Sequence, residues 1–394
     1  MTSLKAVILA GGRGERLLPI TETLPKPLIP IGGKPIIAHQ LEQLQRVGIR
    51  EVIVLTGYLA SSVKSYCDTL NFDLEIICIE SSPDDSSARR ILKSRNFIGD
   101  NFLLIYCDNY ILADIDILNV LKSETELTFL IEPRVEGNIY RDERGLAIYD
   151  SGPRSSKNRF VELGNIAIKS AAFWILLEKL KDLPLCMQEF SKEHDCSSVQ
   201  ITSGFWSISN LCRYLEIIAN RKIVILDRDG VLLEKMPKRE YVTTYEDYKP
   251  MYENWEGLRN IGKLGVDFII ATNQPGVAIG TVSESFLLGL HRKLVSDLLN
   301  FGVNILAVYI CKHHWDASCV CRKPEPGMLL KAISDFDIRK GQTLYVGDDD
   351  RDLLAAQAAD IGGLLIGKDH TGKFDYPNVK SALQAISRAI GAVE

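Results

Sequence analysis

The chain has 394 residues and a formal net charge of −5, a length that suits two or three domains with separate hydrophobic cores. The mild negative charge and the lack of a polybasic run argue against binding to nucleic acid or to an anionic membrane surface. The N-terminal apolar run, Ala6–Ala10, is too short for a signal peptide or a membrane span. We therefore expect a cytoplasmic protein that binds small molecules, and the sequence leaves open whether it forms a homo-oligomer.

A glycine-rich turn follows the first predicted strand, Ala6–Ala10, and reads Gly11-Gly12-Arg13-Gly14. Backbone N–H groups in such a turn can approach phosphate oxygens closely, although tight turns between a strand and a helix need glycine in any case. Further along, Lys26 stands between two prolines, which hold its ammonium group stiffly in place. Another predicted strand, Phe102–Tyr106, is followed by Asp108, where a carboxylate could bind a metal ion.

The motifs LAGGRGERL and LPKPLIPIGGKP, followed by Asp108, resemble the sugar-phosphate nucleotidyltransferases over about the first 215 residues. The resemblance implies a doubly wound, Rossmann-like α/β domain over residues 1–219. It also implies transfer of a nucleotidyl group from an NTP to a sugar 1-phosphate, with release of pyrophosphate. The residues that it assigns to nucleotide binding are Gly11, Gly12, Gly14, Arg16, Lys26 and Asp108; Arg16 and Lys26 would act in catalysis, and Asp108 would bind Mg²⁺.

Three positions depart from the pattern of that family. Ser82–Ser87 replaces a glycine-rich loop near the base, and Cys107 precedes the metal aspartate where glycine is common. Ser207 stands where the family has a second metal-binding aspartate, and a hydroxyl is a poor Mg²⁺ ligand. Glu162 could substitute for it. The alternative hypothesis is a domain that binds a nucleotide sugar without turning it over.

The second half begins with an apolar run, Ile223–Leu226, that predicts a buried parallel strand. It ends in Asp227 and Asp229, and parallel sheets carry their chemistry at the carboxyl ends of strands. Two carboxylates there can share a divalent cation, and one can attack phosphorus, although a solvated acidic turn is an equally good interpretation of this motif alone. Two later strands are predicted to end near Thr272 and Asp348.

Between those two strands lies an eleven-residue segment, Cys311–Cys321, that contains three cysteines and two histidines. Its C-x-H and C-x-C arms fit a tetrahedral structural zinc site with the ligands Cys311, His313, Cys319 and Cys321. Arg322 and Lys323 follow directly, so a bound metal would hold two cations over a phosphate site.

The order of these features resembles the phosphatases of the haloacid dehalogenase (HAD) superfamily over residues 222 to about 368. The sequence CRKPEPGML after the zinc loop narrows the resemblance to the heptose bisphosphate and histidinol phosphatase branch. It implies an HAD-like domain with a zinc loop over residues 220–394. It assigns Asp227 as nucleophile, Asp229 as general acid/base, Thr272 and Lys323 as phosphoryl ligands, and Asp227, Asp348 and the backbone carbonyl of Asp229 as Mg²⁺ ligands, while Asp352 would orient the loop.

The two halves together predict a bifunctional α/β enzyme that requires Mg²⁺ in both domains and structural Zn²⁺ in the second. It would remove the 7-phosphate of a heptose 1,7-bisphosphate and then activate the 1-phosphate, with GTP inferred from pathway logic. Ile279 and Asp349 depart from the phosphatase pattern by removing positive charge. They leave open another phosphorylated sugar or polyol as the substrate.

Overall fold

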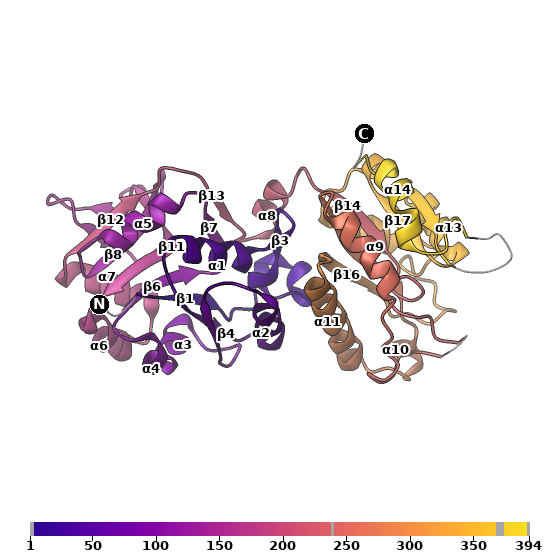
Figure 1. Cartoon of the computed structure of the whole chain (residues 1–394), viewed down its shortest axis with the longest axis horizontal. Helices are drawn as coiled ribbons and strands as arrows, with labels where there is room; N and C mark the ends of the chain where they lie inside the picture. Colours follow the sequence, from indigo (N-terminus) through magenta and orange to yellow (C-terminus); the bar gives the residue numbers. More distant parts are fainter. Residues whose placement is uncertain (1–3, 238–239, 368–373, 392–394) are drawn as a thin grey trace. The chain divides into compact units, whose positions relative to one another are not determined.

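The structure is a computed structural model that describes residues 4–237, 240–367 and 374–391. These residues form two compact units (Figure 1). Unit 1 consists of Met1–Leu17, Pro25–Leu28 and Pro35–Tyr214, and unit 2 consists of Leu18–Leu24, Ile29–Lys34 and Leu215–Glu394. Two short N-terminal segments thus belong to unit 2, and no sequence pattern indicated this. The domain boundary between residues 219 and 220 stays a prediction.

The centre of unit 1 is a parallel part of a nine-stranded sheet, in the order β6-β1-β4-β5. These strands are β1 (Lys5–Ala10), β4 (Glu51–Thr56), β5 (Glu75–Glu80) and β6 (Asn101–Tyr106). The chain runs outward from β1 to β4 and β5 and then returns to β6 on the other side of β1. This reversal creates a switch point between β1 and β6, and open α/β sheets bind ligands outside the carboxyl ends of strands at such points.

The rest of the unit 1 sheet makes it mixed rather than purely parallel. The additional strands are β8 (Leu127–Pro133), β9 (Ile139–Arg141), β10 (Ala147–Tyr149), β11 (Phe160–Lys169) and β12 (Cys196–Gln200). The long strand β11 pairs antiparallel with both β6 and β8. A separate two-stranded ribbon joins β7 (Asn109–Ile111) to β13 (Phe205–Ser207), directly after Asp108.

Helices cover both faces of this sheet, as the doubly wound prediction requires (Figure 1). They are α1 (Ile36–Arg46), α2 (Ala60–Thr69), α3 (Ser87–Lys93), α4 (Arg95–Ile98), α5 (Asp114–Lys122), α6 (Ala171–Leu180) and α7 (Leu183–Glu193). Helix α8 (Leu211–Ile217) follows them and contains the boundary between the two units. Side chains alternate along the strands, so Val7 and Leu104 pack in one core with Phe173 of α6 and Phe190 of α7. Short 3₁₀ turns at Glu15–Leu17, Ile20–Glu22 and Lys26–Leu28 and a two-stranded pair, β2 (Pro30–Ile31) with β3 (Lys34–Pro35), complete the N-terminal segments.

Unit 2 contains a five-stranded, fully parallel sheet in the order β16-β15-β14-β17-β18. Its strands are β14 (Lys222–Leu226), β15 (Val266–Asn273), β16 (Ile305–Cys311), β17 (Leu344–Gly347) and β18 (Gly362–Leu365). Continuous apolar runs such as Ile223–Leu226 are buried, as expected of a parallel strand covered on both faces. The switch point lies between β14 and β17. The prediction of an α/β protein is confirmed.

The helices of unit 2 are α9 (Tyr252–Gly262), α10 (Gly276–Ile279), α11 (Glu284–Phe301), α12 (Gly327–Asp335), α13 (Asp350–Ala358) and α14 (Val379–Ala389), with a 3₁₀ turn at Lys340–Gln342. Helix α9 packs against α14 (Figure 1). Helix α13 begins with a capping box in which Asp349 and Asp352 bind each other's backbone N–H groups. This cap fixes the acidic loop that follows β17. Among the described residues, no helix has the length and apolar character needed to cross a membrane.

Candidate active sites

The candidate phosphatase site lies at the carboxyl edge of the unit 2 sheet. Asp227 follows β14, Thr272 is at the end of β15, and Asp348 follows β17. Because these strands are parallel neighbours, their ends meet at one edge. The structure therefore brings together residues that lie more than a hundred positions apart in the sequence. They line a cavity of about 650 Å³ together with Lys323.

A buried lysine connects two of the carboxylates. The Nζ atom of Lys323 lies 2.9 Å from Oδ1 of Asp227 and 2.8 Å from Oδ1 of Asp352. It also donates to the hydroxyl of Tyr345 at 2.6 Å and to the carbonyl of Ala271 at 3.1 Å. Burial opposes the charge of Lys323, but the two carboxylates raise its pKa above the ordinary value. The ammonium group is therefore a fixed positive charge beside Asp227.

Asp227 is itself buried, with 8% of its surface exposed. Burial raises the pKa of Asp227 to about 7, and the opposing effect of Lys323 only partly offsets this. Its Oδ1 accepts a hydrogen bond from the backbone N–H of Arg228, and its own N–H donates to the carbonyl of Val346 on β17. A further cation near Asp227 would favour the ionised carboxylate, which is the nucleophilic form.

Asp229 is held in a different way from Asp227. Its carboxylate accepts two hydrogen bonds from the guanidinium of Arg228, at 2.9 and 3.0 Å. The side-chain amide of Gln274 donates to Oδ2 of Asp229 and to Oγ1 of Thr272, both at 2.9 Å. Gln274 thereby links the predicted acid/base residue to the predicted phosphoryl ligand. The guanidinium of Arg228 contacts the ring of His291. Burial and the positive charge of Arg228 lower the pKa of His291 well below its usual value, so the ring is neutral.

Three carboxylates at this edge fit a divalent cation. Asp227, Asp348 and Asp352 place ligand atoms within 4.8 Å of one another, and carboxylate oxygens are the protein ligands that Mg²⁺ prefers. The side chain of Asp229 is outside this group, which leaves its backbone carbonyl for the predicted metal role. Gly230 makes the approach possible, because a Cβ there would come 2.3 Å from Oδ2 of Asp348 and its φ of +84° is left-handed.

Asp352 has a second role at the same loop, since its Oδ2 accepts the backbone N–H groups of Asp348 and Asp349 at 3.0 Å. Burial raises the pKa of Asp348, although Lys235 lies only 2.7 Å away. Burial also acts against ionisation of Asp349, but hydrogen bonds from Arg351 hold its pKa below the ordinary value. Asp349 removes positive charge relative to the phosphatase pattern. Lys235 and Arg351, which both line the cavity, partly restore that charge.

The predicted zinc ligands converge. Sγ of Cys319 lies 3.8 Å from Sγ of Cys311 and 3.8 Å from Sγ of Cys321, while Nδ1 of His313 lies 3.6 and 3.2 Å from Sγ of Cys311 and Cys321. Sulfur ligands about 2.3 Å from a tetrahedral zinc ion are about 3.8 Å apart, so the spacing fits this metal. His314 is outside the group, and its ring packs at a tilt against that of Trp315.

The loop after the cluster delivers Lys323 to the phosphatase site. The side chain of Asn273, at the end of β15, accepts the backbone N–H of Lys323 and donates to its carbonyl, both at 3.1 Å. Cys311 is the last residue of the neighbouring strand β16. A metal bound by the cluster would thus fix this loop at both ends, with no open coordination position for catalysis.

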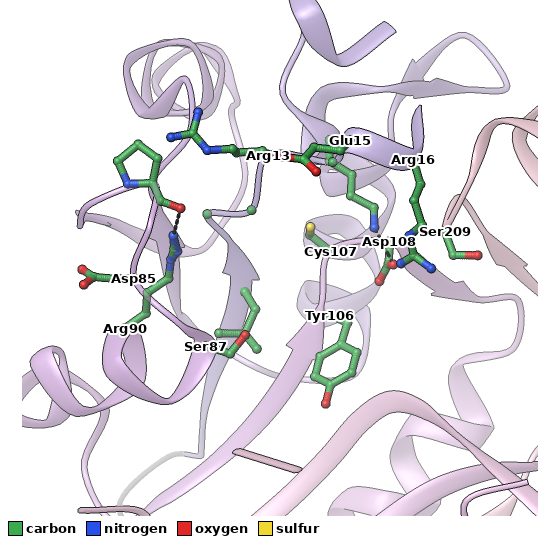
Figure 2. A pocket seen from close by; sticks show the side chains of 16 residues that line it. Arg13, Glu15, Arg16, Asp85, Ser87, Arg90, Tyr106, Cys107, Asp108 and Ser209 are labelled. Atoms are coloured by element: carbon green, nitrogen blue, oxygen red, sulfur yellow. Dashed lines mark hydrogen bonds and ion pairs between the residues drawn. The ribbon is translucent and has the colours of Figure 1, made fainter. Parts of the chain in front are cut away.

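The second candidate site lies at the switch point of unit 1, in a cavity of about 630 Å³ (Figure 2). All the predicted nucleotide-binding residues line it: Gly11, Gly12, Gly14, Arg16, Lys26 and Asp108. Nζ of Lys26 lies 2.6 Å from Oδ2 of Asp108, so the predicted phosphate ligand and the predicted metal ligand are paired. Both side chains remain partly exposed, at 14% and 18%.

Ser207 lies close to the predicted metal ligand Asp108 in the structure. In the β7–β13 ribbon Ser207 pairs with Asn109, the residue after Asp108. Among the described residues, no group of three close His, Cys, Asp or Glu ligand atoms includes Asp108. Glu162 is buried at a bulge of β11 and accepts the backbone N–H of Gly164; burial raises its pKa to about 7. Glu162 does not complete a group of three with Asp108, so within the described residues unit 1 has no group of three metal ligands, whereas unit 2 has three carboxylates in one group.

Several residues at the two sites were missed by the sequence analysis. In unit 2 these are Arg228, Lys235, Gln274, Trp315 and Tyr345, and in unit 1 the main one is Arg90. Arg228 and Gln274 stand directly beside predicted site residues, so their position was a usable signal. Tyr345 and Arg90 sit within a strand and a helix, and only the fold brings them to the sites.

Comparisons with known proteins find a different family in each half of the chain. A nucleotidyl transferase family model matches residues 5–136, and an HAD-hydrolase-like model matches residues 320–386. The D-glycero-beta-D-manno-heptose-1,7-bisphosphate 7-phosphatase of Pasteurella multocida is 34% identical over 159 residues, which are 39% of this chain and 84% of the relative. The D-glycero-alpha-D-manno-heptose-1,7-bisphosphate 7-phosphatase of Photorhabdus laumondii is 35% identical over 147 residues, covering 36% and 79%.

Among solved structures, the D,D-heptose 1,7-bisphosphate phosphatase of B. bronchiseptica, complexed with magnesium and phosphate, is similar to this chain. The identity is 26% and the TM-score is 0.38, and the match covers 42% of this chain and 98% of that one.

Proposed function

Since the chain joins a nucleotidyltransferase domain to an HAD phosphatase domain that belongs to the heptose-1,7-bisphosphate 7-phosphatase family, we propose that it catalyses two consecutive steps of nucleotide-sugar synthesis. The first step removes the 7-phosphate of a heptose 1,7-bisphosphate. The second transfers a nucleotidyl group, from GTP, to the remaining 1-phosphate. The observation that carries the proposal is the buried Asp227, fixed by Lys323 beside Asp348 and Asp352, on the same chain as the glycine-rich cavity of unit 1.

The proposed phosphatase reaction uses the two aspartates in separate roles. A carboxylate oxygen of Asp227 forms a bond to phosphorus while the bond from phosphorus to the sugar oxygen breaks, and Asp229 gives its proton to that oxygen. Asp229 then takes a proton from water, whose oxygen attacks the aspartyl phosphate and releases inorganic phosphate. Arg228 and Gln274 keep Asp229 in place for both proton transfers. Lys323 and the hydroxyl of Thr272 would bind the phosphoryl oxygens.

The metal requirements follow from the donor sets. Asp227, Asp348 and the carbonyl of Asp229 would hold Mg²⁺, which would neutralise phosphoryl charge and favour ionised Asp227. Cys311, His313, Cys319 and Cys321 would hold structural Zn²⁺. Elemental analysis of the purified protein should find one zinc per chain, and a Cys319→Ser variant should lose it. Full occupancy in that variant would remove the cluster from this role.

In the proposed nucleotidyl transfer, a phosphate oxygen of the sugar 1-phosphate attacks the α-phosphorus of the nucleotide, and the bond between the α- and β-phosphates breaks. Lys26, Arg16 and the backbone N–H groups of the glycine-rich turn would stabilise the charge of the phosphates. Asp108 would hold Mg²⁺. These residues position and neutralise the reactants, which supplies most of the catalysis in such a transfer.

One assay tests both reactions. The full-length protein is incubated with heptose 1,7-bisphosphate, Mg²⁺ and GTP, and phosphate and pyrophosphate are measured against time. We expect phosphate first and pyrophosphate afterwards. Release of neither product would contradict the proposal. Phosphate release that is faster with another sugar or polyol phosphate in a substrate panel would instead support the third hypothesis, motivated by Ile279 and Asp349.

A second candidate function for unit 1 is favoured by Ser207, because the position beside Asp108 lacks a second carboxylate. Unit 1 would then bind a nucleotide sugar without turning it over, on the same chain as a working phosphatase. Calorimetry that detects nucleotide-sugar binding, together with no pyrophosphate release from any NTP, would favour this function over the first.

A further inference from the structure

The side chain of Arg90, on α3, lies in the wall of the unit 1 cavity (Figure 2). Only 4% of the residue is exposed. Its Nη2 donates to the carbonyls of Ser82 and Pro83, at 2.9 and 3.0 Å. Its Nε is buried and has no hydrogen-bond partner among the described residues. A buried donor without a partner is destabilising, so the hydrogen bonding of this guanidinium is incomplete in the cavity wall.

Two glycines create the space that the guanidinium occupies. A Cβ on Gly11 would come 2.3 Å from Nε and 2.4 Å from Nη1 of Arg90, and a Cβ on Gly57 would come 2.9 Å from Nη2. Gly11 follows β1 and Gly57 follows β4, so the glycine-rich turn and the next strand end both pack against Arg90. Arg90 is therefore built into the cavity wall and is not a mobile surface side chain.

Arg90 lies apart from Arg16, Lys26 and Asp108, while Gly11 of the glycine-rich turn packs against it. In Figure 2, Arg90, Asp85 and Ser87 lie on one side of the cavity, and Asp108, Arg16 and Ser209 lie on the other. Lys26 is on the Asp108 side through its ion pair. With the phosphates at that side, the Arg90 side is left for the nucleoside.

The negative charge near Arg90 is already paired with other cationic side chains. The carboxylate of Asp85 is paired with Lys93 at 2.6 Å and with Arg89 at 3.1 Å. Within the described part of the chain, Arg90 itself forms no ion pair. Its guanidinium can thus direct donors at a neutral ligand group that accepts hydrogen bonds.

From this geometry we propose that Arg90 selects guanine as the base of the bound nucleotide. The inference rests on the proposed nucleotidyl transfer and deepens it. A guanidinium has donors only, and guanine presents two neighbouring acceptors, O6 and N7, on one edge. Adenine presents N7 beside an amino group that is itself a donor, so the donors of Arg90 would face one acceptor and one other donor. This difference sets guanine above adenine in the pocket.

Two other roles for Arg90 make different predictions. If Arg90 only held the glycine-rich turn against Ser82 and Pro83, its loss would weaken the binding of every nucleotide by the same factor. If it contacted the triphosphate, the same uniform loss would follow, because all NTPs share that group. Only a role in base selection changes the ratio of the affinities for different nucleotides.

The test is calorimetric binding of GTP, ATP and 7-deaza-GTP to the full-length protein without sugar phosphate. We expect GTP to bind at least about tenfold more tightly than ATP and than 7-deaza-GTP, which lacks the N7 acceptor, because neither of these can form the bidentate contact to O6 and N7. The R90K variant keeps the charge but loses the planar donor set. In R90K both advantages of GTP should disappear, because GTP affinity falls more than the affinity for ATP or 7-deaza-GTP; R89K, at an exposed neighbour, should behave like wild type.

Equal loss of affinity for all three nucleotides in R90K would overturn the proposal. Equal affinity of the wild-type protein for GTP and 7-deaza-GTP would also overturn it. The second comparison needs no variant, so a folding defect in R90K leaves the proposal testable. Because binding is measured without turnover, a unit 1 that is inactive in pyrophosphate release would contradict the proposed function and still reveal its base preference.

Discussion

In unit 2 the site lysine lies buried between two carboxylates, whereas in unit 1 the site lysine meets a single, partly exposed carboxylate. Lys323 is 3% exposed as a side chain and Lys26 is 14% exposed. Both sites lie at the switch point of a parallel sheet, so the fold alone does not explain the difference. The two sites differ in how many of the charged groups around the lysine the protein itself supplies. Unit 2 has assembled its anionic site before any ligand binds, while unit 1 relies on its ligands to supply the missing charges.

The largest effect expected from this comparison is the loss of one reaction without the other. Asp227→Asn removes the nucleophile, and we expect phosphate release to fall by at least about 10⁴-fold. Lys26→Ala should abolish pyrophosphate release and leave phosphate release unchanged. Both rates are measured for each variant with heptose bisphosphate and, separately, with heptose 1-phosphate and GTP. Phosphatase activity that persists in Asp227→Asn would remove this residue from its proposed role.

The next effect concerns stability. Lys323→Met leaves Asp227 and Asp352 buried without their cation, and removing one partner of a buried ion pair costs about 3–5 kcal/mol. Lys26→Met breaks a partly exposed pair, for which we expect a loss of about 1 kcal/mol or less. Urea unfolding of the metal-free protein measures both, with Lys331→Met, at an exposed helix pair, as the control. Similar losses in the two site variants would show that the sites do not differ in this way.

Much of unit 2 could be predicted from its sequence because each chemical group is next to a clear strand signal. The run Ile223–Leu226 ends at Asp227, and the zinc cluster is contained in eleven residues, so local spacing was sufficient. Arg90 could not be predicted, since its burial depends on Gly11 and Gly57, which come from two distant strand ends. Lys235 was missed for the same reason: its partner, Asp348, follows a different strand.

The assignment of Leu18–Leu24 and Ile29–Lys34 to unit 2 was equally invisible in the sequence. These segments join unit 2 through contacts such as the hydrogen bond from Asn304 to the carbonyl of Gly33 at 3.1 Å. A backbone carbonyl is present at every residue, so nothing in the residue types indicated that contact. The predicted strand positions, in contrast, depend on local runs of apolar residues, which is why they agree with the structure to within a few residues.

Glu162 provides an intermediate effect that depends on pH. Its pKa is raised by burial from 4.5 to about 7, so the folded protein binds a proton that the unfolded chain releases between these values. Its contribution to stability is complete below about pH 4.5 and is lost as the pH rises through about 7, a change of about 3 kcal/mol. Glu162→Gln keeps an acceptor for the N–H of Gly164 and cannot ionise. We expect the stability of unit 1 at pH 8, relative to pH 5, to be higher in this variant than in wild type; parallel pH profiles would contradict the assignment.

The smallest expected effect tests the comparison most directly, because it adds to unit 1 what unit 2 already has. Ser207→Asp places a second carboxylate beside Asp108, on the ribbon that positions Ser207 opposite Asn109. If unit 1 is limited by its incomplete anionic site, this variant should bind Mg²⁺ with GTP about tenfold more tightly, the order of the gain from one added charged ligand. Ser207→Asn, which has a similar size but no charge, is the matched control. A gain in Ser207→Asn as large as that in Ser207→Asp would mean that side-chain size at this position matters and that the missing carboxylate does not. No gain in either variant would mean that the nucleotide phosphates themselves complete the metal site, and the contrast between the units would then lie in their ligands.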